Sequence, residues 1–213
     1  MIAVLDYGIG NLRSAQKALL HLGAEVRMAT NSREADGASG VVLPGVGAFG
    51  ASMDALRTSG LDRVVLEVIA RDVPFLGICV GYQMLFGASE ESVGTRGLDI
   101  FSGSVSRLRG SVRLPQMQWN TVRRTEVVSR MLGDSREDEW MYFVHSYVPV
   151  PEGEATQSIV GTTNYGEDIA VALERENIWG VQFHPEKSGH AGLDLLGRFV
   201  AHCRHVKHSL VLA

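Results

Sequence analysis

The first part of the chain alternates between two spacings of apolar side chains. Short, mainly apolar segments predict buried strands at residues 2–6, 25–28, 40–43 and 75–78. Between them, apolar side chains recur every three or four positions and predict helices at residues 12–22, 51–59 and 61–71. A strand reaches a parallel neighbour only through a crossover, so this alternation is typical of a parallel sheet. We therefore expect an α/β fold.

The pattern changes after residue 94, where short strand-like segments follow one another at close spacing. They lie at residues 104–108, 121–123, 141–148, 158–162, 169–173 and 178–183. Such spacing leaves little room for crossover helices and favours an antiparallel or mixed extension of the sheet. A last helix is predicted at residues 191–207. Because no linker, internal repeat or low-complexity tract appears, we expect one domain over residues 1–213.

Composition and charge narrow the class of protein. Of the 213 residues, 45% are apolar, which is enough for a real core. The formal net charge is −4, and no basic run of the kind that a nucleic-acid site needs is present. The apolar runs are too short to span a bilayer, and the first residues do not resemble a signal peptide. We therefore expect a cytoplasmic protein that binds neither nucleic acid nor membrane, with Cys79 and Cys203 as free thiols.

Cys79 stands between two glycines, in the segment Gly77-Ile78-Cys79-Val80-Gly81 at the end of a predicted strand. A strand, a sharp turn and a helix with this pattern form the layout of a nucleophile elbow. Glycines allow close backbone approach, and the turn lifts the sulfur to the carboxyl edge of the sheet, where α/β sheets bind ligands. The start of a helix also favours the reactive thiolate. The alternative, a buried structural cysteine, is our interpretation of Cys203, which has no flanking glycines.

A thiol nucleophile needs a base, and the base needs a group that orients it. His184 ends an apolar strand, and Glu186 follows two residues later. In an extended chain such residues point to the same side, so the carboxylate can fix the imidazole tautomer. Pro185 between them stiffens the pair. The alternative is a surface histidine beside an unrelated glutamate.

Attack on a carbonyl also needs N–H groups that stabilise the developing oxyanion. The residue after an elbow nucleophile commonly donates one, which here is Val80. A second N–H must come from a neighbouring loop, and the glycine-rich loop at residues 44–47 follows the preceding parallel strand. Because glycines flank Val46, its N–H is free to point at the oxyanion. Val46 and Val80 are thus the candidate donors.

Two other kinds of site, a nucleotide site at the glycine-rich segments and a metal site at the C-terminal histidines, have weaker support. The glycine-rich segments at residues 8–10 and 44–50 lack the Lys-Ser/Thr pair of a P-loop and the full three-glycine dinucleotide fingerprint, so no nucleotide cofactor is expected. His202, His205 and His208 lie near Cys203 at the end of the last predicted helix. Cations are favoured at such an end, so a solvated tail explains these histidines better than a metal site.

Three segments, LPGVGAFG, GICVGYQMLF and GVQFHPEKS, together resemble the class I glutamine amidotransferase family. More narrowly, DYGIGNLRS, GASEES, LPQMQWN and YFVHSY are similar to the glutaminase subunits of imidazole glycerol phosphate synthase, from histidine biosynthesis. The motifs occur in the family's order and cover nearly the whole chain. The resemblance implies a flavodoxin-like fold, with a central, mostly parallel sheet flanked by helices and an antiparallel extension.

The resemblance also implies roles for individual residues. Cys79, His184 and Glu186 would form a triad that hydrolyses glutamine to glutamate and ammonia through a thioester on Cys79. His184 would protonate the departing amine and later activate water. The family's glutamine site maps onto Gly47, Gln83, Glu91, Ser146 and Tyr147.

The implied partner is a separate cyclase subunit with a (β/α)8 barrel, and Asn11, Trp119 and Asn120 would face it. The cyclase would use the ammonia to make imidazole glycerol phosphate and an aminoimidazole carboxamide ribotide. The chain departs from the family at Gln116 and Gln118, where histidine and glycine are usual. That departure affects the expected interface and leaves the triad untouched.

Two alternatives stay open at this point. One is a glutaminase subunit that serves another amidating enzyme, which would share the triad. The other is a catalytically silent binding module on the same fold, against which the intact triad argues.

Overall fold

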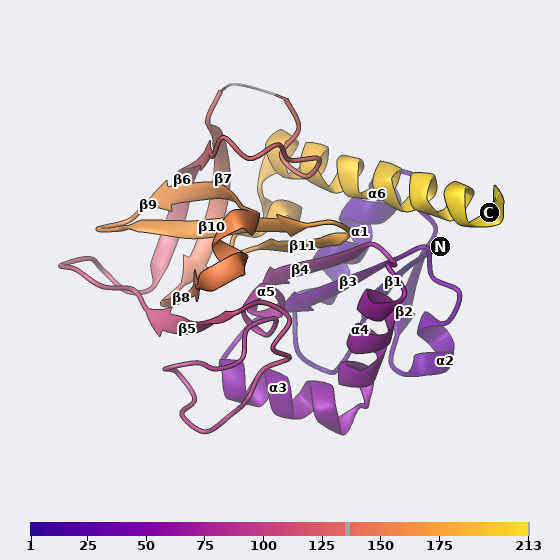
Figure 1. Ribbon diagram of the computed structural model, residues 1–213, viewed down its shortest axis with the longest axis horizontal. Helices are drawn as coiled ribbons and strands as arrows, with labels where there is room; N and C mark the ends of the chain where they lie inside the picture. The colour runs from indigo at the N-terminus through magenta and orange to yellow at the C-terminus, as the bar shows by residue number, and fades with distance from the viewer. Residues whose placement is uncertain (135–136, 213) are drawn as a thin grey trace.

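Nine strands of the described residues form one mixed sheet between two layers of helices (Figure 1). The computed structural model describes residues 1–134 and 137–212, without the side chains of residues 207–212. From one edge to the other, the sheet contains β2 (Val26–Ala29), β1 (Ile2–Leu5), β3 (Gly40–Gly45), β4 (Phe75–Cys79), β11 (Ile178–Val181), β10 (Asp168–Arg175), β9 (Ile159–Asn164), β6 (Gln116–Arg124) and β7 (Glu139–His145). A smaller sheet pairs β5 (Gly103–Arg107) with β8 (Tyr147–Pro151).

The half of the sheet from β2 to β11 is parallel, and the half from β11 to β7 is antiparallel. Every residue of β1, β3, β4 and β11 is buried, because helices cover both faces of these strands. Burial on both faces explains their continuous apolar sequences. The order β2-β1-β3-β4-β11 is the flavodoxin-like winding. The predicted parallel core with an antiparallel extension is confirmed.

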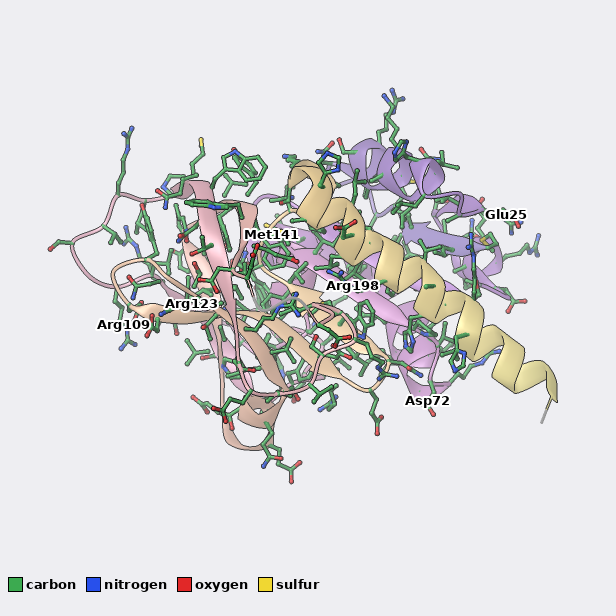
Figure 2. The ribbon with its side chains drawn as sticks, turned by 90° about the horizontal axis from the view of Figure 1, so that it is seen from above. Glu25, Asp72, Arg109, Arg123, Met141 and Arg198 are labelled. Atoms are coloured by element: carbon green, nitrogen blue, oxygen red, sulfur yellow. The ribbon has the colours of Figure 1, made fainter. Side chains whose placement is uncertain are left out.

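The helices form a layer on each face of the sheet. On one face, α1 (Leu12–His21) packs against α6 (Gly189–Leu212), and on the other α3 (Phe49–Thr58) packs against α4 (Leu61–Ala70), which also contacts the one-turn helix α2 (Ser32–Ala35) (Figure 1). Figure 2, seen from above, shows α6 lying across the sheet, with Arg198 near its middle and Met141 of β7 beside its first turns. Within the described residues, no helix is both long and apolar enough to cross a membrane.

Two predicted elements differ from the observed ones. The helix expected after the turn at Cys79 is a single turn, α5 (Val80–Gln83), which begins directly after Cys79. It cannot continue because the carbonyls of Met84 and Leu85 accept hydrogen bonds from the N–H groups of Leu98 and Ile100, at 2.9 and 2.8 Å. The strand expected at residues 141–148 is divided at Ser146 into β7 and β8, which belong to different sheets.

Two short 3₁₀ helices complete the fold, η1 (Gly153–Ser158) and η2 (Pro185–Lys187). The segments that follow β1, β3, β4 and β11 all begin at the carboxyl edge of the parallel half. The candidate catalytic residues gather at this edge: the loop at residues 46–48 follows β3, Cys79 ends β4, and His184 follows β11. This edge is where open α/β sheets bind ligands.

Candidate active site

Cys79 is the last residue of β4 and the N-cap position of α5, and its backbone is strained. Its φ of 55° and ψ of −112° lie in a region that residues with a side chain rarely occupy. Such conformations cost about 1–3 kcal/mol each and persist only where the surrounding structure enforces them. A strained cysteine at a strand-to-helix turn is the geometry of a nucleophile elbow.

The two glycines beside the elbow are required by close backbone contacts. A Cβ on Gly81 would lie 1.8 Å from the carbonyl oxygen of Leu43 in β3. A Cβ on Gly77 would lie 2.9 Å from the carbonyl oxygen of Gly81. The turn can therefore close only if both positions lack a side chain, as the sequence predicts.

His184 and Glu186 form a buried pair. The Nδ1 atom of His184 lies 2.8 Å from Oε1 of Glu186, and both side chains are almost fully enclosed. The prediction of an extended backbone between them is wrong, because the chain turns in η2, which Pro185 begins. Proline is favoured at the first position of a helical turn, and this turn brings the carboxylate back to the ring. Since Glu186 accepts a hydrogen bond from Nδ1–H, Nε2 is the ring nitrogen that can exchange a proton with a reacting group.

The electrostatics of His184 favour the protonated ring. Burial by itself lowers the pKa of His184, but the neighbouring Cys79 and Glu186 outweigh it and raise the pKa to about 10. Among the described residues, the Nε2 atom has no aligned hydrogen-bond partner, although Cys79 is near enough to raise the pKa of the ring. The Cys79 sulfur also lies 3.8 Å from the side-chain nitrogen of Gln182. Because α5 is only one turn long, its helix dipole is a small source of positive potential. The protonated His184 ring is therefore the main positive group beside the Cys79 sulfur.

A cavity of about 230 Å³ opens at Cys79. Pockets for drug-sized ligands measure roughly 300–1,000 Å³, so this cavity suits a smaller molecule, of the size of an amino acid. It is lined by Val46, Gly47, Cys79, Val80, Gln83, Glu91, Pro115, Val144, His145, Ser146, Tyr147 and His184. The structure thus brings both expected oxyanion donors and all five expected substrate residues to the cavity that holds Cys79.

Two of the expected substrate residues also hold the cavity wall together. The amide nitrogen of Gln83 donates to the carbonyl oxygen of Tyr147 at 2.9 Å and to the side-chain oxygen of Gln182 at 3.1 Å. The carboxylate of Glu91 accepts from the backbone N–H of Phe49 at 2.7 Å, which caps the start of α3. Both side chains are therefore fixed before any ligand enters.

Pro115, Val144 and His145 also line the cavity, although no role is predicted for them from the sequence. His145 Nδ1 lies 2.9 Å from the carbonyl oxygen of Tyr147, which identifies Nδ1 as the protonated nitrogen. Burial lowers the pKa of His145 to about 4, so the ring is neutral near pH 7. The sequence pattern that points to His145 is the alternation of buried and more exposed residues along β7. It places His145 on the buried side of the strand, with Phe143 and Met141.

Cys203 and His202 are packed inside the fold, so the predicted solvated tail is wrong for His202, which is 8% exposed within α6. Cys203 is buried, and burial raises the pKa of its thiol to about 12. His202 stacks on Trp179, with ring centroids 5.3 Å apart, and its Nε2 lies 2.8 Å from the side-chain oxygen of Asn177. The side chain of His208 lies outside the described residues. Among those that are described, no group of three or more potential metal ligands gathers.

The three expected interface residues differ in their surroundings. The side-chain oxygen of Asn11 accepts from the Ser14 hydroxyl at 2.9 Å, and the amide of Asn120 donates to the carbonyl oxygen of Asn164 at 2.9 Å. Trp119 is 47% exposed on β6. Asn11 and Asn120 thus have structural roles within the chain, whereas Trp119 is available at the surface.

Comparison with known proteins agrees with this geometry. The family model for "Glutamine amidotransferase class-I" matches residues 3–203. A protein of Moorella thermoacetica named imidazole glycerol phosphate synthase subunit HisH is 46% identical over 204 residues, which cover 96% of each chain. The imidazole glycerol phosphate synthase hisHF of Arabidopsis thaliana is 41% identical over 202 residues, covering 94% of this chain and 34% of that longer protein.

Solved structures share the fold at lower identity. A crystal structure titled glutamine amidotransferase superposes with a TM-score of 0.74 at 18% identity, over 95% of this chain and 98% of that one. The structure of PurLQS from Thermotoga maritima gives a TM-score of 0.70 at 16% identity, over 97% of both chains. The family model and the full-length relatives show that this chain belongs to the class I glutamine amidotransferase family.

Proposed function

We propose that this chain is the glutaminase subunit of imidazole glycerol phosphate synthase, with Cys79 as nucleophile, His184 as acid and base, and Glu186 as the group that orients His184. The observation that carries the proposal is that Cys79 and His184 line one cavity of amino-acid size, while Glu186 contacts the far nitrogen of the His184 ring. The HisH relatives, at 46 and 44% identity, support the assignment of the pathway.

The reaction begins when the Cys79 thiolate adds to the side-chain carbonyl carbon of glutamine. The protonated His184 ring then gives its Nε2 proton to the leaving nitrogen, the C–N bond breaks, and ammonia departs from a thioester. In the second half, neutral His184 takes a proton from water, and the hydroxide breaks the C–S bond to release glutamate. Glu186 keeps Nδ1 protonated throughout, so Nε2 is the atom that exchanges protons.

Both tetrahedral intermediates carry a negative oxygen, for which Val46 and Val80 are the proposed N–H donors. Both residues line the cavity beside Cys79. Gly47, Gln83, Glu91, Ser146 and Tyr147 would hold the amino acid in place, and they also line it. Each oxyanion donor typically contributes on the order of 10²–10³ in turnover.

The proposed partner is a cytoplasmic cyclase subunit with a (β/α)8 barrel that receives the ammonia. The relatives named as subunits and the longer Arabidopsis hisHF protein support an assembly of two parts. Direct transfer has a chemical reason, because ammonia released into neutral water is mostly protonated and no longer nucleophilic. The cyclase would then form imidazole glycerol phosphate and aminoimidazole carboxamide ribotide.

An exposed apolar face on β6 and β7 supports the position of this partner. Met117, Trp119 and Trp140 are 62%, 47% and 58% exposed. The strand register places these three residues on one face with Tyr142 and Val144, and we call the five residues the β6–β7 patch. Patches rich in aromatic residues and methionine are typical of protein interfaces. Val144 also lines the cavity, so the patch adjoins the source of ammonia.

Affinity labelling tests the proposed triad. A glutamine analogue that carries an electrophile should modify Cys79 and leave Cys203 unmodified, as read by peptide mass spectrometry. Both thiols are buried, but Cys79 lines the proposed glutamine cavity together with His184, whereas burial raises the pKa of the Cys203 thiol to about 12. In His184→Ala the labelling should be lost, since no imidazolium remains to favour the thiolate. Label on Cys203 would contradict the assignment, and no labelling of either thiol would favour a silent binding module.

Truncation of Trp119 tests the interface. Trp119→Ala should weaken binding of the cyclase subunit about 30-fold, measured by titration calorimetry, because a central aromatic anchor is commonly worth about 2 kcal/mol. Leu66→Ala is the control, since Leu66 is 43% exposed on α4, away from the patch. Equal affinities for the two variants would show that the partner binds elsewhere.

A further inference from the structure

Tyr7 lies in the segment that follows β1, and its side chain is buried against the loop at residues 44–47. The residue is 6% exposed. Its hydroxyl donates to the carbonyl oxygen of Pro44 at 2.8 Å. Burial and the nearby Cys79 both raise the pKa of Tyr7 well above its ordinary value, so the hydroxyl keeps its proton at any working pH. The neutral hydroxyl is therefore a permanent donor to the loop at residues 44–47.

Ser52 of α3 holds the same loop from the other side. Its fully buried hydroxyl lies 3.5 Å from the carbonyl oxygen of Val46, in position to donate a weak hydrogen bond. It is also close enough to the Tyr7 hydroxyl to lower the pKa of that group. The two hydroxyls thus contact the carbonyl groups on either side of Gly45.

Gly45 itself is enclosed by the elbow. A Cβ at this position would lie 2.6 Å from the N atom of Gly81, and 2.9 Å from both the Tyr7 hydroxyl and Cβ of Val80. In the sheet, Gly45 pairs with Cys79. The backbone of Gly45 is therefore held directly against the turn that carries the nucleophile.

Peptide planarity converts these contacts into control of one N–H group. The Pro44 carbonyl fixes the plane between Pro44 and Gly45, and the Val46 carbonyl fixes the plane between Val46 and Gly47. The plane between them carries the N–H of Val46, and with both neighbours held it can turn only through ψ of Gly45 and φ of Val46. The two hydroxyls thus restrict the backbone on both sides of the peptide that carries the Val46 donor.

We propose that Tyr7, assisted by Ser52, is a positioning residue that aims the Val46 N–H at the oxyanion. Tyr7 touches neither substrate nor reacting atoms in this role, which rests on the proposed glutaminase function.

Tyr7→Phe tests the proposal, because it removes one oxygen atom and keeps the ring. Glutamine turnover of the full chain, saturated with the cyclase subunit, should show a kcat about 10-fold lower and a KM within about 3-fold of the wild type, since an oxyanion donor acts mainly in the transition state. The rate of Cys79 alkylation by iodoacetamide should be unchanged, because alkylation needs the thiolate but no oxyanion hole. Tyr165→Phe is the matched control, since the Tyr165 hydroxyl also donates to a backbone carbonyl, that of Arg113 at 2.6 Å, and Tyr165 is absent from the cavity lining.

Several results would overturn the proposal. They are an unchanged kcat in Tyr7→Phe, an equal loss in Tyr165→Phe, or alkylation that falls in parallel with turnover, which would mean that Tyr7 acts on the thiolate. If Tyr7→Phe does not fold, Ser52→Ala should still lower kcat about 3-fold without changing alkylation, and no change there would overturn it as well. A wild type that shows no turnover with any cyclase partner would instead refute the proposed function itself.

Discussion

Cys79→Ser is expected to lower glutamine turnover by about 10⁴-fold or more while the fold is retained. Oxygen is smaller than sulfur and fits the same position, so the substitution preserves the turn between Gly77 and Gly81. A serine hydroxyl is far less acidic than a thiol, however, so it is not ionised near pH 7 and is a much weaker nucleophile at this position. Removal of a nucleophile in comparable triads costs about this much.

The measurement is glutamate release under saturating glutamine, with far-ultraviolet circular dichroism to confirm folding. Cys203→Ser serves as the control, because Cys203 is buried beside Gly40 and its raised pKa of about 12 keeps it a thiol. The control should lose some stability and keep its turnover. Residual turnover above about 1% of wild type in Cys79→Ser would exclude Cys79 as the nucleophile.

The parts of the site that could be predicted from sequence are those in which local pattern dictates geometry. The glycines around Cys79 predict a tight turn because only residues without a side chain fit it, and a Cβ at Gly81 would overlap β3. Likewise, the short spacing between His184 and Glu186 makes their contact a local event. The alternation of strands and helices similarly predicts the parallel half of the sheet.

Other parts depend on long-range contacts that no local pattern contains. The one-turn length of α5 follows from hydrogen bonds to residues 98 and 100, and the division at Ser146 follows from the pairing of β8 with β5. The hydrogen bond from Tyr7 to Pro44 joins residues 37 positions apart. His145 becomes a cavity residue only because β7 ends where β4 and β11 present Cys79 and His184.

The second large effect is expected for Gly81→Ala, which should destabilise the protein by at least about 3 kcal/mol and reduce turnover at least 10²-fold. The added Cβ would lie 1.8 Å from the Leu43 carbonyl oxygen, so α5 and β3 must separate. Overpacking of this kind ordinarily costs about 1–3 kcal/mol, and here the obstacle is backbone that cannot change rotamer. Separation also moves Cys79 away from the loop that carries Val46, and a displacement of about 1 Å can cost about 10²-fold in rate.

Chemical denaturation and glutamate release measure the two effects, and the chain contains a matched control. Gly197 lies within α6, and a Cβ there would meet only a side-chain carbon of Leu22, at 3.7 Å. Gly197→Ala should therefore leave turnover unchanged and raise the free energy of unfolding by about 0.4–1 kcal/mol, because alanine restricts the unfolded chain and favours the helix. The same atom added to two helices then has opposite effects on stability. If Gly81→Ala were as stable and active as wild type, the close contact between the elbow and β3 would not be what sets the position of Cys79.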